Sequence, residues 1–246
     1  MLQRASASTG RLTRLTPAIV LIATAAACWA ITARRTQGMD MGPGTDLGSL
    51  GWFAVVWVTM MAAMMLPSLG PMALTYTRLT RAVVFAAGYL LTWLGAGVVA
   101  YGVIRCVRSL DLSWLAWDSG GPYVAGGAIL AAALYELTPV KSTCLRHCRN
   151  PELLRRRQRA GLPGTLLTGV EHGGFCVGSS WALMASLFAL GVMNVTWMIV
   201  VAALVAIEKL LPSDRVAIGA TVVLIAALGL AVALAPDQVP GLTIPG

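Results

Sequence analysis

Long apolar runs separated by short polar and basic segments make up most of the chain. A helix needs about 20 mainly apolar residues to cross the hydrocarbon core of a bilayer, and seven runs reach or approach this length. They cover residues 17–33, 50–74, 82–104, 122–137, 163–192, 195–211 and 216–235. The pattern therefore predicts an all-α fold, a polytopic transmembrane helix bundle with about seven spans.

The Lys and Arg residues lie almost wholly between the apolar runs, and their distribution predicts an orientation. With the N-terminus in the cytoplasm, 14 of the 18 basic residues fall on the inner side. The four on the outer side are Arg34, Arg35, Arg105 and Arg108. Because inner loops carry the excess of Lys and Arg, this asymmetry predicts that the N-terminus is inside the cell.

The chain is predicted to form one domain. A basic cytoplasmic N-terminus at residues 1–16 precedes a transmembrane helical domain at 17–235, which contains a basic inner loop at 141–161. A short outer tail at 236–246 follows. The first run is Ala-rich and preceded by arginines, which is also typical of a cleavable signal peptide. Its removal would leave six spans with their directions unchanged.

Composition supports a membrane protein and limits its partners to the bilayer and its contents. The chain is 57% hydrophobic and 11% charged, whereas soluble domains carry about 25% charged residues. Its net charge of +8 comes without a basic helix or an aromatic-interleaved patch, so we expect no nucleic-acid partner. The basic run at 155–159 predicts contact with anionic lipids at the inner face, and other membrane proteins are further candidate partners. Five cysteines without regular spacing do not predict a disulfide framework.

Three of the five cysteines and both histidines gather between residues 144 and 176, near the inner ends of two predicted spans. On a helix, Cys144 would share a face with His147 and Cys148, at offsets of three and four. Thiolate and imidazole ligands suit zinc, copper or iron. We therefore predict a metal site formed by Cys144, His147, Cys148, His172 and Cys176. The alternative is that the cysteines pack at the membrane boundary and that His147 is solvated.

The fifth run combines ionisable groups with closely spaced glycines. An ionised side chain within a span costs at least about 2.5 kcal/mol, so Glu171 needs a partner or water and could complete the metal site. Alternatively, Glu171 and His172 lie in a re-entrant segment at the headgroups. The glycines form two overlapping small-xxx-small pairs, which predict close approach by another backbone. These glycines are Gly169, Gly173, Gly174 and Gly178.

Four methionines occupy the later part of the second run, at residues 60, 61, 64 and 65. Thioethers select cuprous copper, so Met61 and Met65 are possible supporting ligands, and copper is preferred over zinc or iron. Methionine is also an adaptable packing residue, which is the interpretation we favour for the group as a whole. Pro67 follows and predicts a bend, because proline removes a helical hydrogen bond.

Glu136 and Glu208 lie where the fourth and sixth runs reach the inner face. Each of them either supports the metal site or pairs with a neighbouring Lys or Arg. Lys209 can extend from its helix end to the interface. Lys141 and the arginines near Cys144 are expected to help keep a thiol ionised.

Several of these segments together resemble a bacterial family of predicted metal-binding integral membrane proteins of unknown function. The similar segments are residues 60–68 (MMAAMMLPS), 135–141 (YELTPVK), 144–151 (CLRHCRNP), 181–184 (WALM), 193–194 (MN), 197–198 (WM) and 208–209 (EK). The resemblance covers residues 50–211 and implies a helical protein of the bacterial cytoplasmic membrane with a bound metal, but no established reaction. Members of that family often carry cysteines where this chain has Ser179 and Ser180. If those cysteines are ligands, the site of this chain is altered, and Cys176 alone supplies that part of it.

The expected function is that of an integral membrane metal-binding protein that handles copper or a similar soft ion. It would act as a chaperone, an assembly factor or a transporter component. One alternative is a membrane-embedded enzyme subunit that uses a metal or thiol on a lipophilic substrate, with Glu136 or Glu171 as acid or base. That alternative ranks lower because the chain has no complete nucleophilic triad, phosphate loop or HExxH sequence. A proton-coupled small-solute transporter and a purely structural protein are further candidate functions.

Overall fold

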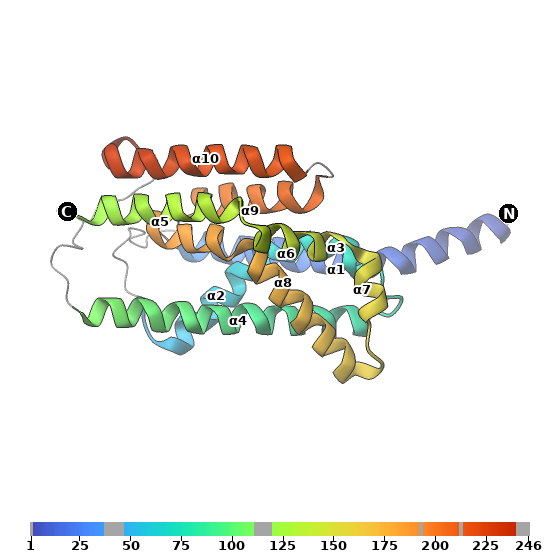
Figure 1. Cartoon of the computed structure of the whole chain (residues 1–246). Coiled ribbons are helices and arrows are strands. Elements are labelled where there is room, and N and C mark those ends of the chain that lie inside the picture. The colour runs from blue at the N-terminus through green and yellow to red at the C-terminus, as the bar shows by residue number, and fades with distance from the viewer. Residues whose placement is uncertain (1, 37–46, 111–119, 192–193, 212–213, 240–246) are drawn as a thin grey trace.

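The computed structural model of the chain describes residues 2–36, 47–110, 120–191, 194–211 and 214–239. All regular elements within these ranges are helices (Figure 1), so the predicted all-α fold class is confirmed. The α-helices are α1 (Leu2–Thr36), α2 (Leu50–Met65), α3 (Gly70–Ala73), α4 (Leu79–Ser109), α5 (Gly121–Glu136), α6 (Pro139–Arg149), α7 (Pro151–Arg157), α8 (Gly161–Leu190), α9 (Val195–Leu210) and α10 (Asp214–Leu234). Two 3-10 helices, η1 (Pro67–Leu69) and η3 (Pro236–Gln238), complete the described elements. Of the predicted outer tail, residues 240–246 lie outside the described ranges.

Length and hydropathy identify spans in α1, α4, α8 and α10, and two bent pairs of helices raise the number to six. These six coincide with six of the seven predicted apolar runs. The remaining run forms α9, which has 16 residues and is therefore about 24 Å long, shorter than the ~30 Å of a hydrocarbon core. The protein is thus a multi-pass membrane protein with four to six candidate spans, where the apolar runs alone predict about seven.

Both bent pairs contain a proline at the bend. The helices before and after Pro67 meet at 49°, which confirms the bend predicted there, and α5 meets α6 at 66°. Pro139 begins α6, and the Thr138 hydroxyl caps it by accepting a hydrogen bond from the backbone N–H of Lys141 at 3.3 Å. The second bend sets α6 against α8 and α9. As a result, Lys141 and Cys148 both face the protein interior.

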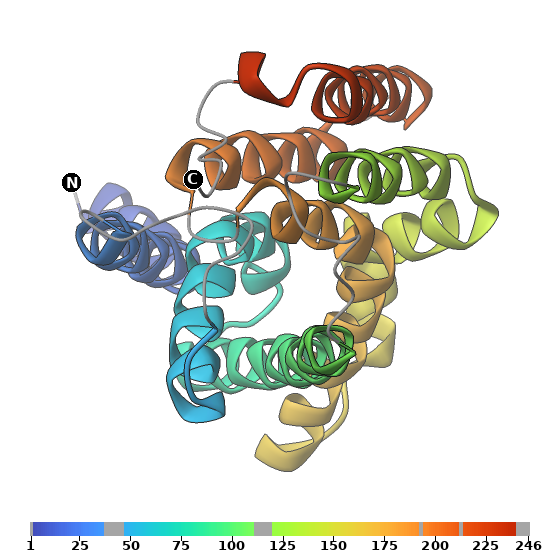
Figure 2. The same cartoon turned by 90° about the vertical axis from the view of Figure 1, so that its left-hand side faces the viewer.

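The helices lie approximately side by side along one direction, and α3, α6 and α7 gather where α1 begins (Figure 1). We call this the α6 end of the bundle. Seen along the bundle, α5 and α10 form one side and α4 the opposite side, with α8 between them (Figure 2). Because α8 contacts α4, α5, α6 and α9, it is the central helix at which remote parts of the chain meet.

Glycines bring the backbones of α4 and α8 into direct contact. A Cβ atom on Gly169 would lie 2.1 Å from the carbonyl oxygen of Phe85, and one on Gly88 would lie 2.2 Å from that of Leu166. The close approach predicted from the small-xxx-small spacing is therefore confirmed at Gly169. Gly174 does not take part, because a Cβ atom there would have no neighbour within 4 Å.

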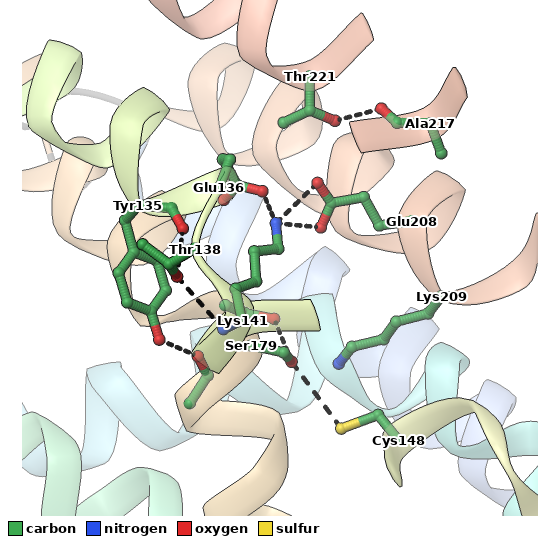
Figure 3. Close-up of polar contacts among 12 residues, drawn as sticks. Tyr135, Glu136, Thr138, Lys141, Cys148, Ser179, Glu208, Lys209, Ala217 and Thr221 are labelled. Atoms are coloured by element: carbon green, nitrogen blue, oxygen red, sulfur yellow. Dashed lines mark hydrogen bonds and ion pairs between the residues drawn. The ribbon is translucent and has the colours of Figure 1, made fainter. Parts of the chain in front are cut away.

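A buried charge cluster joins α5, α6 and α9. The Lys141 side chain, which is 0% exposed, lies between the carboxylates of Glu136 and Glu208, both 1% exposed (Figure 3). Its Nζ atom donates to the two Glu208 carboxylate oxygens at 2.8 and 2.7 Å and forms an ion pair with Glu136. Arg149 is close enough to Glu208 for their charges to interact. We refer to these residues as the Lys141 cluster. Of the two alternatives left open by the sequence, both glutamates take the ion pair with a basic residue.

Replacing Gly169 by Ala should destabilise the protein, because the new methyl group would overlap the Phe85 carbonyl oxygen and overpacking typically costs about 1–3 kcal/mol. The midpoint of thermal unfolding in mild detergent measures the effect. Gly174→Ala is the matched control, since it adds the same methyl group to the same helix where nothing lies within 4 Å. Equal midpoints for the two variants would contradict the close contact of α4 with α8.

Replacing Lys141 by Met should lower the stability by about 3–5 kcal/mol, because two buried carboxylates would lose their shared ammonium group. Arg155→Met is the control. It removes an exposed cation whose pair with Glu152, at 3.5 Å with side chains 62% and 60% exposed, should contribute at most about 1 kcal/mol. Thermal unfolding of both variants in the same detergent compares them. A Lys141→Met protein as stable as Arg155→Met would show that the cluster does not hold α6 in place.

Candidate metal-binding site

Cys176 is at the centre of a buried polar network that crosses the bundle. It lies in the middle of α8, and its side chain is 0% exposed. The Tyr89 hydroxyl of α4 lies 2.9 Å from its Sγ atom, and the Lys209 ammonium group of α9 donates to the same atom at 2.8 Å. Side chains from two further helices thus meet at one sulfur atom, and one of them is a cation.

Lys209 brings a positive charge among several soft and polar atoms. Besides its contact with Cys176, its Nζ atom lies 3.8 Å from Met65 Sδ and 3.5 Å from Ser68 Oγ. Figure 3 shows the side chain extending from α9 toward the region of Cys148, away from the Lys141 cluster. The expected extension of Lys209 to the membrane interface is therefore wrong. Because a nearby cation stabilises a thiolate, Lys209 is placed to compensate a negative charge on Cys176.

Cys148 supplies a second buried thiol from α6. Its side chain is 6% exposed and close enough to Cys176 for the two thiols to influence each other electrostatically. Its Sγ atom is 3.8 Å from the Ser179 hydroxyl oxygen, and that hydroxyl donates to the Cys176 carbonyl at 2.9 Å. Ser179 thus lies beside the thiols. We call Cys148 and Cys176 the thiol pair.

Cys144 packs against the backbone of α8. A Cβ atom on Gly178 would lie 2.8 Å from the Cys144 Sγ atom, so the missing side chain at Gly178 makes room for the thiol. The Tyr135 hydroxyl donates to the Gly178 carbonyl at 2.6 Å and holds α5 at the same turn of α8. The close approach predicted for this glycine therefore involves a side chain of α6.

The two histidines have aromatic neighbours. The His147 ring stacks on Phe175, with ring centroids 4.3 Å apart and planes 10° apart. Its Nδ1 atom lies 2.9 Å from the Thr143 carbonyl oxygen, which can only accept, so Nδ1 carries the proton and Nε2 of the neutral ring has a lone pair for another partner. His172 is 6% exposed and lies beside Phe85, with centroids 5.5 Å apart.

Both imidazoles line a small pocket at the α6 end that has room for about one water molecule. Glu171 lines the same pocket and forms an ion pair with Arg157, while Arg159 lies 3.7 Å from its other carboxylate oxygen. We call this the imidazole pocket. The partner expected for an ionisable group at Glu171 is therefore present, supplied by the basic segment around α7.

The predicted ligands separate into the thiol pair, the imidazole pocket and the place of Cys144 against Gly178, rather than forming one closed shell. Among the described residues, no group of three or more His, Cys, Asp or Glu side chains is arranged to hold a metal ion. The thioether of Met65 also lies in this region, with its Sδ atom 3.8 Å from the Lys209 Nζ atom. Met61 is 0% exposed in the hydrophobic core, as expected for packing. Glu136 and Glu208 belong to the Lys141 cluster.

Sequence analysis did not identify Tyr89 or Ser68 as part of the site, and it did not predict that Lys209 points inward. The sequence does contain a sign of the role of Lys209, because two charged residues, Glu208 and Lys209, stand together at the end of an apolar run. Both neighbours on α9 turn out to be engaged by charged or sulfur-bearing partners. Tyr89 lies in an ordinary apolar run and carried no such signal.

Comparison with models of known protein families gives a match over most of the chain. The model of a family described as PpoB2, copper chaperone, matches residues 54–232. No match was found among curated proteins or solved structures. The matched range covers well over half of the chain and includes the thiol pair, the imidazole pocket and the Lys141 cluster. It agrees with the expectation of copper handling, and the chain therefore belongs to the PpoB2 copper chaperone family.

Proposed function

We propose that the protein carries Cu(I) as its cargo, held between the thiol pair and the thioether of Met65. The observation that carries this proposal is the position of the Lys209 ammonium group, which contacts the sulfur atoms of Cys176 and Met65. A group with one positive charge is already accommodated where soft donors converge. A cuprous ion carries the same charge and would take this place when Lys209 withdraws along its flexible four-carbon chain.

The donor set favours Cu(I) over zinc. Thiolates and thioethers select cuprous copper, whereas structural zinc sites take four nitrogen or sulfur ligands. Two thiols and one thioether lie together here, and the neighbouring position is a serine, Ser179. All three sulfur-bearing side chains are buried within candidate spans. Water, a hard oxygen ligand, is thereby kept away from the cargo.

The imidazole pocket supports a role in exchange between the thiol pair and the α6 end. His172 and Cys176 are four residues apart on α8, so they lie on one face of the helix, one turn apart. An ion that enters from the α6 end would meet the Nε2 atom of His147 and the ring of His172 before it reaches Cys176. Cys144, half-buried on α6, and Glu171, in the wall of the pocket, add a thiol and a carboxylate to this route.

We infer that the α6 end faces the cytoplasm of a bacterial inner membrane. The basic residues of α6 and α7 lie there, and α1 begins at the same end (Figure 1), as the positive-inside rule requires for an N-terminus inside. Arg155 and Arg156 have side chains 62% and 77% exposed and are placed to contact anionic lipid headgroups. A copper chaperone in this position would deliver its cargo to a membrane protein partner.

The alternative of a proton-coupled transporter has less support. A carboxylate that relays protons should face a water-filled path, whereas Glu136 and Glu208 both contact Lys141. Acid–base catalysis by Glu171 is disfavoured for a similar reason, since Arg157 and Arg159 surround its carboxylate.

Wild-type protein reconstituted with Cu(I) should bind about one ion per chain, and the double variant Cys148→Ser/Cys176→Ser should bind none, because hydroxyls replace both thiolates. Elemental analysis after removal of free metal measures the content. The matched control is Cys28→Ser/Cys106→Ser, which removes two thiols outside the site and should retain copper. Parallel loading with zinc and iron tests the choice of metal.

Two results would contradict the proposed function. One is copper content that is unchanged in the Cys148→Ser/Cys176→Ser protein while its unfolding midpoint is also unchanged. The other is wild-type protein that stays metal-free with copper or retains zinc in preference to it.

Met65→Leu should weaken Cu(I) binding by about tenfold, equivalent to about 1.4 kcal/mol, because one of three sulfur donors is lost while the hydrophobic volume is nearly kept. Competition with a chromogenic Cu(I) chelator measures the affinity. Met60→Leu is the control, since Met60 is equally buried in the same helix. Equal losses in both variants would show that Met65 acts only through packing.

A further inference from the structure

An apolar cavity of about 520 Å³ lies in the half of the bundle away from the α6 end. Its walls come from Trp57 of α2 and from the second halves of α4 and α8. The volume falls in the range of small-molecule pockets, roughly 300–1,000 Å³. Because its lining is almost wholly apolar, the cavity suits a hydrocarbon ligand.

The walls of this cavity are held in place by specific contacts. The Trp57 Nε1–H group donates to the Trp93 carbonyl at 2.8 Å, and the Trp57 ring stacks on Phe188 with centroids 5.6 Å apart. Gly97 lets α4 approach this ring, since a Cβ atom there would lie 2.4 Å from Trp57. The shape of the cavity is therefore fixed by fitted aromatic side chains, which distinguishes it from a loosely packed gap.

The cavity opens sideways, toward the lipid. Val99 and Val103 of α4 and Trp181 of α8 line it and are 67%, 57% and 48% exposed. Both helices are candidate spans, so the opening lies at the depth of the bilayer. An empty space there would forfeit dispersion contacts for its whole lining. Acyl chains are the apolar molecules that surround such an opening.

A pair of arginines lies just beyond the end of the cavity. Arg108 follows the lining residue Ile104 by four positions on α4, so both lie on one face of the helix. Arg105 is exposed, and its guanidinium group lies over the Tyr101 ring, 5.9 Å from the centroid. Arg105 and Arg108 are two of the four basic residues on the outer side of the predicted topology. The positive-inside rule accounts for basic residues on the inner side, so it does not explain why these two are present. Guanidinium groups bind phosphate with paired hydrogen bonds.

We propose that this cavity binds one phospholipid, with an acyl chain between α2, α4 and α8 and its phosphate at Arg108 and Arg105. The apolar lining of the cavity and the cationic end of α4 match the two parts of such a molecule. The site is independent of the metal proposal. None of the cavity's lining residues belongs to the thiol pair.

Native mass spectrometry of protein exchanged from bilayers of phosphatidylethanolamine and phosphatidylglycerol into mild detergent tests the proposal. Wild-type protein should keep one phospholipid per chain. Ala100→Phe, which fills the cavity from α4, and Arg108→Gln, which removes a phosphate ligand, should each keep about tenfold less, a change equivalent to about 1.4 kcal/mol. The controls are Val98→Phe, on the exposed surface of the same helix, and Arg81→Gln, at its other end; both should retain the lipid.

Unfolding midpoints of all four variants establish that they are folded before the lipid contents are compared. Wild-type protein that keeps no phospholipid, or an Ala100→Phe protein that keeps as much as wild type, would overturn the proposal, since only surrounding lipid would then contact this face. A dimer in wild type that Ala100→Phe abolishes would also overturn it, because a second copy would occupy the cavity. Full retention in Arg108→Gln would overturn the assignment of the phosphate.

Discussion

Burying the ammonium group of Lys141 is possible only while Glu136 and Glu208 lie on both sides of it, because an unpaired charge inside the bundle would cost several kcal/mol. Glu136 ends α5, Lys141 lies in the first turn of α6, and Glu208 lies in the last turn of α9. This one requirement therefore fixes the start of α6 after its bend. Two turns further along the same helix, Cys148 reaches α8 beside Cys176.

The neighbouring residues Glu208 and Lys209 link the charge cluster to the thiol pair. Glu208 accepts from Lys141, and Lys209 donates to Cys176, so one turn of α9 takes part in both. The donors that would hold copper come from α2, α6 and α8, and α9 supplies the cation now among them. Under the proposed function, the local charge stays balanced if monovalent Cu(I) takes the place of the monovalent Lys209 ammonium group, whereas a divalent ion would add a charge.

The fold class could be predicted from the apolar runs because membrane spans leave a signal in length and composition alone. The bend at Pro67 and the close contact at Gly169 could also be predicted, because each depends on a single residue. Proline lacks the N–H group of a helical hydrogen bond, and glycine lacks the side chain that would keep another helix away. The site was predicted less well. Counting Cys and His singled out the region that contains the thiol pair, but it could not show that His147 stacks on Phe175 or that Lys209 points inward. Those outcomes depend on which faces of α6, α8 and α9 meet, and that information lies in long-range packing.

The direct contact of the α4 and α8 backbones at Gly88 and Gly169 limits how the protein can open. At each glycine, a carbonyl oxygen of the other helix occupies the space where a side chain would be, and this contact opposes sliding of one helix along the other. Cys176 on α8 and Tyr89 on α4 therefore keep their positions relative to each other. Cys148, by contrast, lies on the shorter helix α6 (Pro139–Arg149), so the two members of the thiol pair are held by different contacts, one by the α4–α8 contact and the other by the Lys141 cluster.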